Sequence, residues 1–319
     1  MTVQSTQYLS RAEIVARYYE RLDAQTNSLW LGGLTEYVPS KAASNLYKMI
    51  SMVPQLQEAI GATEAEALTT NGFEIRNKEY KAALKIPKMD LRRDQTGLLN
   101  ARIGEFSQRG LSHWLKLCTT LIENGHAATC YTGSYFFATN HSEGNSGTYK
   151  NLLTSNEVSD LNVGTATAPT PYEMAKAILG VVMWFFTYLD DQGEPRNEMA
   201  RNFLVMVPVG LFGAALTAAT KATLDTGSGS IDNPLANNPK FKIDVDVNPR
   251  LSWTDKFVVS RTDGFLKPLI RQEEQLLETD VFGPESEHFR LNDEALIKIN
   301  TFRNVGYGTP WQMIRATLS

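Results

Sequence analysis

One regular pattern dominates the 319-residue chain: residues 96–125 read TGLLNARIGEFSQRGLSHWLKLCTTLIENG. Apolar or small residues recur there at steps of three and four, the spacing of one helix face. They are Leu99, Ile103, Phe106, Gly110, Trp114, Leu117, Cys118 and Leu121. Asp94 or Thr96 can cap the start, and Gly125 stands where a left-handed C-terminal cap is expected. A helix of this length spans about 40 Å, which suits a spine better than a compact enzyme domain.

A period-two pattern comes directly before this helix. Over residues 80–87, apolar positions alternate with polar or small ones, which predicts a strand with one polar face. Together with Phe73 and Ile75, this pattern predicts a long two-stranded ribbon over residues 73–94. Between residues 74 and 94 the chain carries seven Lys or Arg against four acids. Because an isolated two-stranded ribbon is marginal in water, we expect it to lie on its own domain or on a neighbouring subunit.

The charged edge of this ribbon is the candidate interaction surface. Binding of single-stranded nucleic acid would favour several aromatic residues among the basic ones, and Tyr80 is the one aromatic residue between positions 74 and 94. A surface that meets the acidic residues of a partner protein is therefore the favoured interpretation. The candidate subunit-interface residues are Arg76, Lys78, Tyr80, Lys81, Lys85, Lys88, Arg92 and Arg93.

The rest of the chain mixes helices and strands. Before the ribbon, the spacing of Leu46, Met49, Ile50 and Val53 predicts a helix that ends by Gly61, within an arm of short helices. Farther on, the patterns predict a loop at 142–170, buried helices at 171–189 and 209–224, and strands at 203–208, 241–248, 253–261, 265–278 and 295–319. Since no βαβ unit repeats, the expected fold class is α+β.

The composition argues against several classes of protein. With 42% apolar residues the chain can bury a sizeable core. A net charge of −4 provides no overall basic field for nucleic acid. Two cysteines in so long a chain favour free thiols in a reducing compartment. The N-terminus lacks signal-peptide features, and the apolar runs 178–189 and 203–219 are too short for a bilayer or are broken by Pro208, so we expect no membrane span.

One pair of residues could carry catalysis. Cys130 and His141 lie at the ends of CYTGSYFFATNH, and as nucleophile and base they would make the chain a Cys/His hydrolase. Thr132 and Gly133, however, predict the turn of an aromatic β-hairpin. Packing is therefore the favoured interpretation of this segment.

Other candidate sites are weaker. Asp244, Asp246 and Asn248 resemble the start of a calcium loop, but Pro249 stands where that loop requires glycine. Residues 226–230 are glycine-rich without the lysine of a phosphate-binding loop. We therefore expect no catalytic residues, no cofactor and no metal site, and hence no enzyme.

Five segments together resemble a known family. They are CYTGSYFFATNH at 130–141, DDQGEP at 190–195 with LVMVPVGL at 204–211, NNPKFKIDVDVNPRLS at 237–252, LKPLIRQEEQ at 266–275 and GYGTPWQM at 306–313. In this order they resemble the major head subunits of Mu-like phages, and the resemblance covers roughly residues 70–319. It implies the Hong Kong 97-like, or Johnson, fold of tailed-phage capsid proteins.

The resemblance also implies a division of the chain. We expect an N-terminal arm at 1–69, an extended loop at 70–96 and a peripheral domain with the spine helix at 97–170. An axial domain is expected at 171–240, and residues 241–319 would add return strands of the peripheral domain and the C-terminal part of the axial domain. Within that segment, the strand at 241–248 is expected to return to the peripheral domain. Because the sequence begins at Met1, we expect no N-terminal scaffold segment to be removed.

The implied function is that of a major capsid protein in the virion of a tailed double-stranded DNA phage. Pentamers and hexamers of the chain would form an icosahedral head, assembled in the host cytoplasm. Implied partners are further copies of the chain, a portal, a scaffold or protease, possible decoration proteins, and packaged DNA in non-specific contact, with no membrane. An encapsulin-like cellular compartment shares the fold and stays open as an alternative, as does the less favoured hydrolase.

Overall fold

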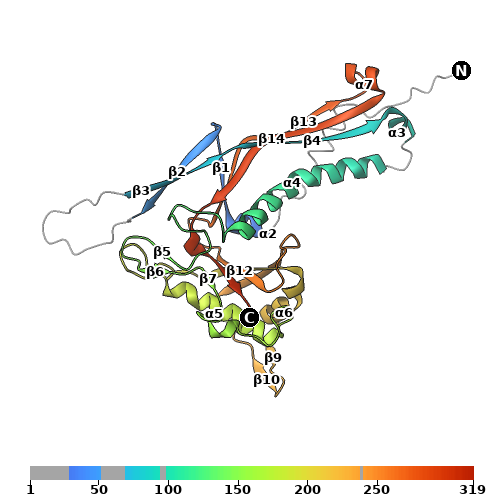
Figure 1. Ribbon diagram of the computed structural model, residues 1–319. Helices are drawn as coiled ribbons and strands as arrows, with labels where there is room; N and C mark the ends of the chain where they lie inside the picture. Colours follow the sequence, from blue (N-terminus) through green and yellow to red (C-terminus); the bar gives the residue numbers. More distant parts are fainter. Residues whose placement is uncertain (1–28, 52–68, 94–97, 238–239) are drawn as a thin grey trace.

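The structure is a computed structural model that describes residues 29–51, 69–93, 98–237 and 240–319. Figure 1 shows an elongated part, with a long sheet beside one long helix, and a compact part below it, where helices cover a second sheet. This mixture confirms the predicted α+β class. The helix caps predicted at Asp94 and Thr96, and most of the predicted arm, lie outside the described residues.

The elongated part is built on a four-stranded sheet. Its strands follow the order β1 (Thr35–Pro39), β13 (Leu269–Phe282), β14 (Glu294–Tyr307) and β4 (Lys78–Pro87). β1 runs parallel to β13, and the other neighbours are antiparallel. Three short helices adjoin these strands: α2 (Leu29–Leu34), α3 (Lys88–Arg93) and α7 (Glu287–Asn292). The alternation predicted over residues 80–87 is confirmed, because Ile86 is buried whereas Lys81 and Lys85 are exposed.

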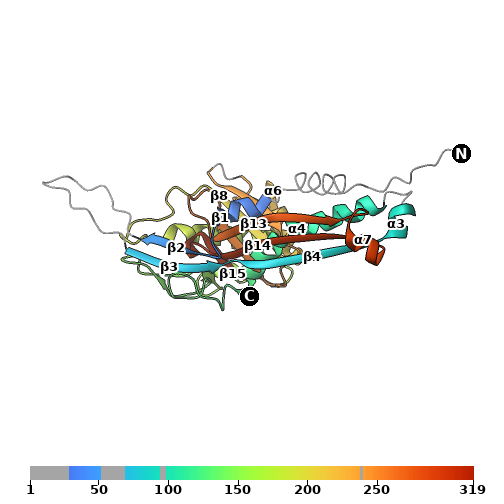
Figure 2. The same cartoon turned by 90° about the horizontal axis from the view of Figure 1, so that it is seen from above.

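The predicted spine helix is α4 (Leu98–Asn124), which runs along the sheet (Figure 1, Figure 2). Its apolar stripe is confirmed at Trp114 and Cys118, which are buried. The guanidinium of Arg303 on β14 lies 4.7 Å from the centroid of the Trp114 ring. The same side chain donates a hydrogen bond of 2.9 Å to the carbonyl oxygen of Gly110. These contacts attach the middle of the helix to the centre of the sheet.

Gly125 follows α4 but does not act as the predicted left-handed cap, because its φ angle is not positive. A Cβ atom at this position would lie 2.6 Å from the ring of Phe137. The glycine is therefore required by the close approach of an aromatic ring and not by the backbone conformation.

The predicted two-stranded ribbon over residues 73–94 is wrong in its pairing. β3 (Thr69–Arg76) and β4 are consecutive strands on either side of Asn77, and they do not pair with each other. β3 pairs with β2 (Ser44–Ser51) in an antiparallel hairpin, whereas β4 pairs with β14. Alternation along a chain identifies a strand but not its partner, so one continuous pattern was assigned to one ribbon.

The helix predicted around Leu46 is also wrong, because these residues form β2. A short apolar run satisfies helical and strand spacings almost equally well, and the pairing with β3 decides in favour of the strand. Tyr47 stacks on Phe73 of β3 with ring centroids 5.4 Å apart. The hydroxyl of Tyr47 donates to the side-chain oxygen of buried Gln272 on β13 at 2.7 Å, which fixes the base of the hairpin to the long sheet. The rest of the hairpin projects away from the molecule (Figure 1).

The compact part contains a five-stranded sheet. Its order is β11 (Lys242–Val247), β8 (Asn202–Val207), β12 (Lys256–Arg261), β15 (Met313–Thr317) and β7 (Leu152–Leu153). The two predicted helices are confirmed as α5 (Pro171–Trp184) and α6 (Val209–Thr220). Thr170 and Glu173 form a capping box at the start of α5. The largest cluster of buried apolar residues joins these helices to the sheet.

The strand predicted at 241–248 is confirmed as β11, which pairs in parallel with β8 at the edge of the compact sheet. The remaining short elements are β5 (His141–Ser142), β6 (Thr148–Tyr149), η1 (Ser159–Leu161), η2 (Phe185–Thr187), β9 (Thr223–Asp225), β10 (Ser230–Asp232) and η3 (Pro310–Gln312). Within the described ranges, no helix has the length and apolar character needed to span a membrane.

Candidate functional site

The eight candidate subunit-interface residues lie on three elements and not on one ribbon. Arg76 ends β3, four of the others lie on β4, and the last three lie on α3. Among them, Arg76, Lys78, Lys81 and Lys85 are exposed and Lys88 is partly exposed. The side chains of Arg92 and Arg93 lie outside the described part of the structure.

Four of these cations have acidic partners in their own subunit. Arg76 and Lys81 pair with acids on the same strand, Glu74 at 3.4 Å and Glu79 at 2.7 Å. Lys85 reaches Glu294 of β14 at 2.9 Å, and Lys88 reaches Asp293 at 2.6 Å. Hydrogen bonding to the Lys85 ammonium is the main cause of the lowered pKa of Glu294. Exposed ion pairs add only about 0 to 1 kcal/mol to folding, so these lysines remain able to exchange partners when another chain approaches.

Tyr80 has a different environment from the charged candidates. It lies half-buried between β4 and α4, where its ring meets His113 edge to face with centroids 4.3 Å apart. Burial raises the pKa of Tyr80, and burial followed by the charge of Arg303 lowers the pKa of His113 to about 4. This tyrosine therefore packs the helix against the sheet of its own subunit.

The segment from Cys130 to His141 contains the predicted turn. The amide of Gly133 donates to the carbonyl oxygen of Cys130 at 3.0 Å, and Gly133 has a φ angle of +82°. A positive φ is favourable for glycine because it lacks a Cβ atom. Beyond the turn, Phe136 and Phe137 are fully buried in the core that also contains α4. The hairpin prediction is confirmed in short form, with one β-bridge between Thr129 and Tyr135.

Cys130 and His141 do not form a nucleophile and base pair. The hydroxyl of Thr132 lies between them, 3.1 Å from the Cys130 Sγ atom and 3.0 Å from His141 Nδ1. Burial raises the pKa of the Cys130 thiol and lowers the pKa of the fully buried His141. A catalytic cysteine requires a depressed pKa that yields the thiolate. The geometry and both pKa shifts therefore favour the packing interpretation over the hydrolase.

A buried network around Glu143 was not found from the sequence. Its Oε1 atom accepts hydrogen bonds from the hydroxyls of Tyr131 at 2.7 Å and Tyr149 at 2.9 Å. Its Oε2 atom accepts two from the Arg196 guanidinium, each of 3.0 Å. That guanidinium lies 4.9 Å from the centroid of the Trp311 ring. These partners are 6 to 53 positions from Glu143, with no fixed spacing, so no sequence motif indicates the network. It fixes the segment after the hairpin to the compact part.

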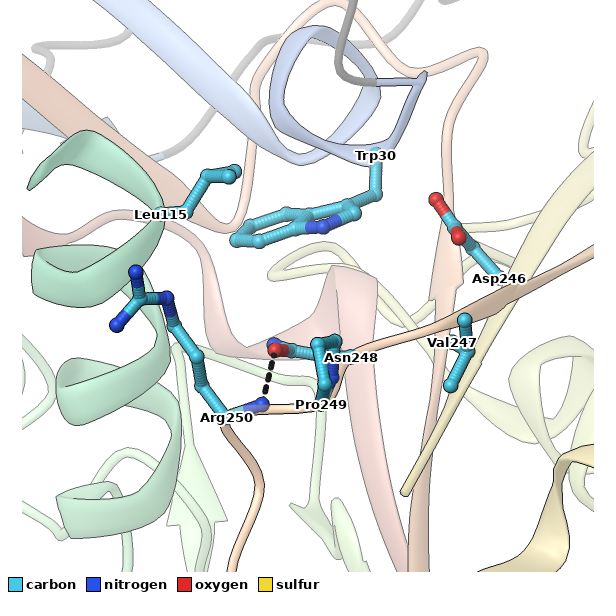
Figure 3. Close-up of a pocket in the computed structure, with 7 residues that line it drawn as sticks. All are labelled: Trp30, Leu115, Asp246, Val247, Asn248, Pro249 and Arg250. Atoms are coloured by element: carbon cyan, nitrogen blue, oxygen red, sulfur yellow. Dashed lines mark hydrogen bonds between the residues drawn. The ribbon is translucent and has the colours of Figure 1, made fainter. Parts of the chain in front are cut away.

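An open pocket of about 300 Å³ lies between the two parts of the molecule (Figure 3). Trp30 comes from α2, Leu115 comes from α4, and residues 246–250 come from the end of β11 and the loop after it. Figure 3 shows the Trp30 ring above Asn248, whose side-chain oxygen accepts a hydrogen bond of 3.1 Å from the Arg250 amide. Burial raises the pKa of Asp246 at the edge of this pocket.

Asp244, Asp246 and Asn248, which resemble the start of a calcium loop, do not converge on one point in the structure. The carboxylate of Asp244 pairs with Lys242 at 2.8 Å, and Asp246 lies at the pocket. The Asn248 side-chain amide instead donates to the hydroxyl of Thr119 on α4 at 2.9 Å. No group of three or more histidine, cysteine or acidic residues with metal-binding geometry occurs in the described part of the chain.

Comparison with known families and relatives places the chain among phage head proteins. Residues 12–169 match the family described as Mu-like prophage major head subunit gpT. The Mu-like prophage FluMu major head subunit of Haemophilus influenzae is 28% identical over 135 residues, which are 42% of this chain and 44% of that relative. The major capsid protein of Escherichia phage Mu is 27% identical over 104 residues, 33% of this chain and 34% of the relative. The aligned segments span less than half of either relative.

Solved structures match almost the whole chain. The capsid of cyanophage P-SCSP1u has a TM-score of 0.56 at 11% identity, covering 92% of this chain and 88% of that one. A virus-like particle from Pyrococcus furiosus has a TM-score of 0.53 at 10% identity, covering 96% and 98%. At these identities the likeness shows the fold, and it confirms the Hong Kong 97-like fold that the sequence resemblance implies.

Proposed function

Because the chain belongs to the Mu-like prophage major head subunit family, we propose that it is a major capsid protein of a tailed double-stranded DNA phage. It would assemble as pentamers and hexamers into an icosahedral head, with a structural role and no enzymatic one. Its place would be the virion capsid, assembled in the host cytoplasm. The family match and the capsid fold support this function from two independent directions.

The observation that carries the proposal is the β2–β3 hairpin. It leaves its own subunit (Figure 1), and a two-stranded hairpin is marginally stable alone in water. Leu46 on this hairpin is 63% exposed and is available for contact with a neighbouring chain. A hairpin of this kind is suited to lie across a neighbouring copy, so that many moderate contacts add up over a closed shell.

The pairing of β2 with β3 also leads us to propose other domain boundaries than those implied by the sequence resemblance. The extended loop corresponds to residues 44–76 and not to 70–96, since β4 is part of the long sheet. The long sheet and α4 form the peripheral domain. The five-stranded sheet with α5 and α6 forms the axial domain, which includes β11. The exposed cations of β3 and of the start of β4 lie at the root of the extended loop, whereas Lys85 and Lys88 lie towards the opposite end of the long sheet, near α3 (Figure 1). Both groups remain candidates for contact with neighbouring subunits.

Further partners follow from the proposed function. A portal, a scaffold or protease, and possible decoration proteins would bind the assembled head, and no membrane would be involved. Packaged DNA would contact the inner surface non-specifically. A net charge of −4 suits a container that does not bind its genome tightly.

The test shortens the hairpin without disturbing its base. Replacing residues 48–72 by Asn-Gly keeps the stack of Tyr47 on Phe73 and the contact with Gln272, and Asn-Gly favours a tight turn. We expect soluble, folded subunits with the melting temperature of the full chain and no closed shells in electron micrographs. The unaltered chain, assembled in parallel under the same conditions, is the control and should form shells. Normal particles from the shortened chain would refute the role of the hairpin.

One alternative has support of its own. The Pyrococcus furiosus particle matches 96% of this chain, and a cellular compartment would share the fold of a phage head. The contents of purified particles distinguish the two functions. Nuclease-protected DNA of uniform length supports the phage head, whereas an enclosed enzyme without DNA would support the compartment.

A further inference from the structure

The loop between β12 and β13 presents an unusual apolar surface. Phe265 is fully exposed, at 103% of its reference area, and the adjacent Leu266 is 50% exposed. Exposed single leucines are common on proteins, but a phenylalanine without contact to its own chain is not. We refer to these two residues as the apolar loop.

The backbone around the apolar loop is held in place. The guanidinium of Arg261 pairs with Asp263 at 2.6 Å, and the other carboxylate oxygen of Asp263 accepts from the amide of Arg201 at 2.7 Å. On the far side, the Lys267 ammonium donates to the carbonyl oxygen of Thr262 at 2.6 Å. These contacts fix the backbone on both sides of Phe265, and they hold its side chain in an exposed position.

Close packing at Gly264, next to Phe265, also restricts the backbone of the loop. A Cβ atom at Gly264 would meet the side-chain nitrogen of the fully buried Gln312, so a larger residue there would have to displace that side chain. A preorganised aromatic side chain loses little conformational freedom on binding, which is the property of residues that dominate protein interfaces.

The pocket of Figure 3 is mainly apolar, so it complements the apolar loop. Its walls include the side chains of Trp30, Leu115, Val247 and Pro249, and more of its lining is apolar than polar. The pocket is open to solvent, and its volume of about 300 Å³ is large enough for an inserted side chain. Because Phe265 is fully exposed, its own pocket does not receive it.

Charges beside the two surfaces match as well. Lys267 follows the apolar loop directly, and no carboxylate lies within ion-pair distance of it among the described residues. Asp246 lines the pocket without an ion-pair partner among the described residues, and Arg250 lines the same pocket on the opposite side (Figure 3). Docking that places the Lys267 ammonium at the Asp246 side, away from Arg250, is electrostatically favourable.

We propose that Phe265 and Leu266 of one copy seat in the pocket of a neighbouring copy. The occupant is a second copy because each chain carries both an exposed apolar loop with Lys267 beside it and an apolar pocket with Asp246 at its edge. Contacts between two different surfaces of identical chains are head-to-tail, and they close into a ring when the rotation between copies permits it. The inference rests on the proposed function in one respect, namely that copies of the chain assemble.

The first experiment compares two exposed positions. Phe265→Ser removes the apolar ring, and Leu276→Ser is the matched control on β13, where the leucine is 68% exposed. Shell formation is followed by light scattering against protein concentration, with electron micrographs of the products. We expect Phe265→Ser to raise the concentration needed for half assembly roughly tenfold or more, and the control to leave it unchanged. Equal behaviour of the two variants would overturn the inference.

The second experiment identifies the receiving surface. Chains with Leu266→Cys, which keep the Phe265 ring, are mixed with chains carrying Val247→Cys, assembled and oxidised, and the products are separated without reductant. We expect a disulfide-linked dimer from this mixture and none when Leu276→Cys replaces Leu266→Cys. A missing link, or a link that forms equally well when the partner chains lack Val247→Cys and offer only Cys118 and Cys130, would overturn the docking.

The two proposals fail in different ways. If the unaltered chain forms no shells under any assembly condition, the proposed function fails. If it forms shells and Phe265→Ser forms them equally well, only the docking fails.

Discussion

The compact part and the elongated part of this molecule differ in the size of the apolar core that each one buries. In the compact part, α5 and α6 cover a five-stranded sheet, and the core includes fully buried phenylalanines such as Phe185, Phe203 and Phe257. In the outer half of the elongated part, a single helix covers the sheet, and the core cluster there consists of Ile86, Val281, Phe289, Ala295 and Ile297. The core of the compact part therefore provides most of the folding stability of the free subunit, whereas the elongated part presents surfaces that are suited to contact with other copies.

Matched truncations in the two cores test this contrast most strongly. Phe203→Ala removes a ring that contacts Phe185 at 5.4 Å between centroids, and we expect a loss of about 3 to 5 kcal/mol in the free energy of unfolding. Phe289→Ala in the elongated part should cost about 2 kcal/mol or less, since this end can relax or open locally. Urea denaturation of the unassembled subunit measures both. Equal losses would show that the two parts are equally important for the subunit.

The junction of the two parts provides a sharper test at Gly125. Gly125→Asn should cost about 1 to 3 kcal/mol, because any side chain meets the Phe137 ring. Gly133→Asn is the control, since Gly133 has a positive φ, which asparagine tolerates, and no atom lies within 4 Å of its Cβ position. Thermal melting compares the variants. If Gly125→Asn were the milder change, the helix would end in a left-handed cap after all.

The smallest expected effect concerns pH in the elongated part. The pKa of His113 is lowered to about 4, whereas the unfolded chain titrates near 6.5. Between these values the unfolded state binds the proton preferentially, so the free energy of unfolding falls as the pH falls from 6.5 to 4. Allowing for the partial exposure of the ring, the loss is about 1 kcal/mol.

Replacement of this histidine should remove that slope. His113→Phe keeps a ring against Tyr80 and cannot titrate, whereas His126→Phe changes an exposed histidine and serves as the control. Denaturation in urea at pH 7, 5.5 and 4 compares the variants with the unaltered chain. A slope unchanged in His113→Phe would show that other groups produce the pH dependence.

Much of the local structure could be predicted. The stripe around Trp114 predicts α4, the alternation over 80–87 predicts β4, and the Thr132-Gly133 turn is found where its residues indicate. Each of these patterns reflects contacts between residues close in the sequence or one face of a single element. The misassigned segment at 44–51 is short, and its apolar spacing fits either structure.

The candidate interface was predicted less completely. Basic residues near Lys81 and Lys85 are exposed, as their place on the polar face of the strand requires. The acidic partner of Lys85 could not be predicted, since Glu294 is more than 200 positions away and meets Lys85 only through the pairing of β4 with β14. The network around Glu143 and the pocket beside Trp30 escaped the sequence analysis for the same reason.

The order of residues alone specifies most of the helices and strands, which faces they bury, and which family the chain resembles, because these depend on periodicity and on local motifs. The tertiary structure decides which strands pair, so it separates β3 from β4, places β11 beside β8 and creates the projecting hairpin. The physical reason is that the backbone of every strand offers the same hydrogen bonds. The choice of partner is made by packing between side chains far apart in the sequence, such as Tyr47 against Gln272.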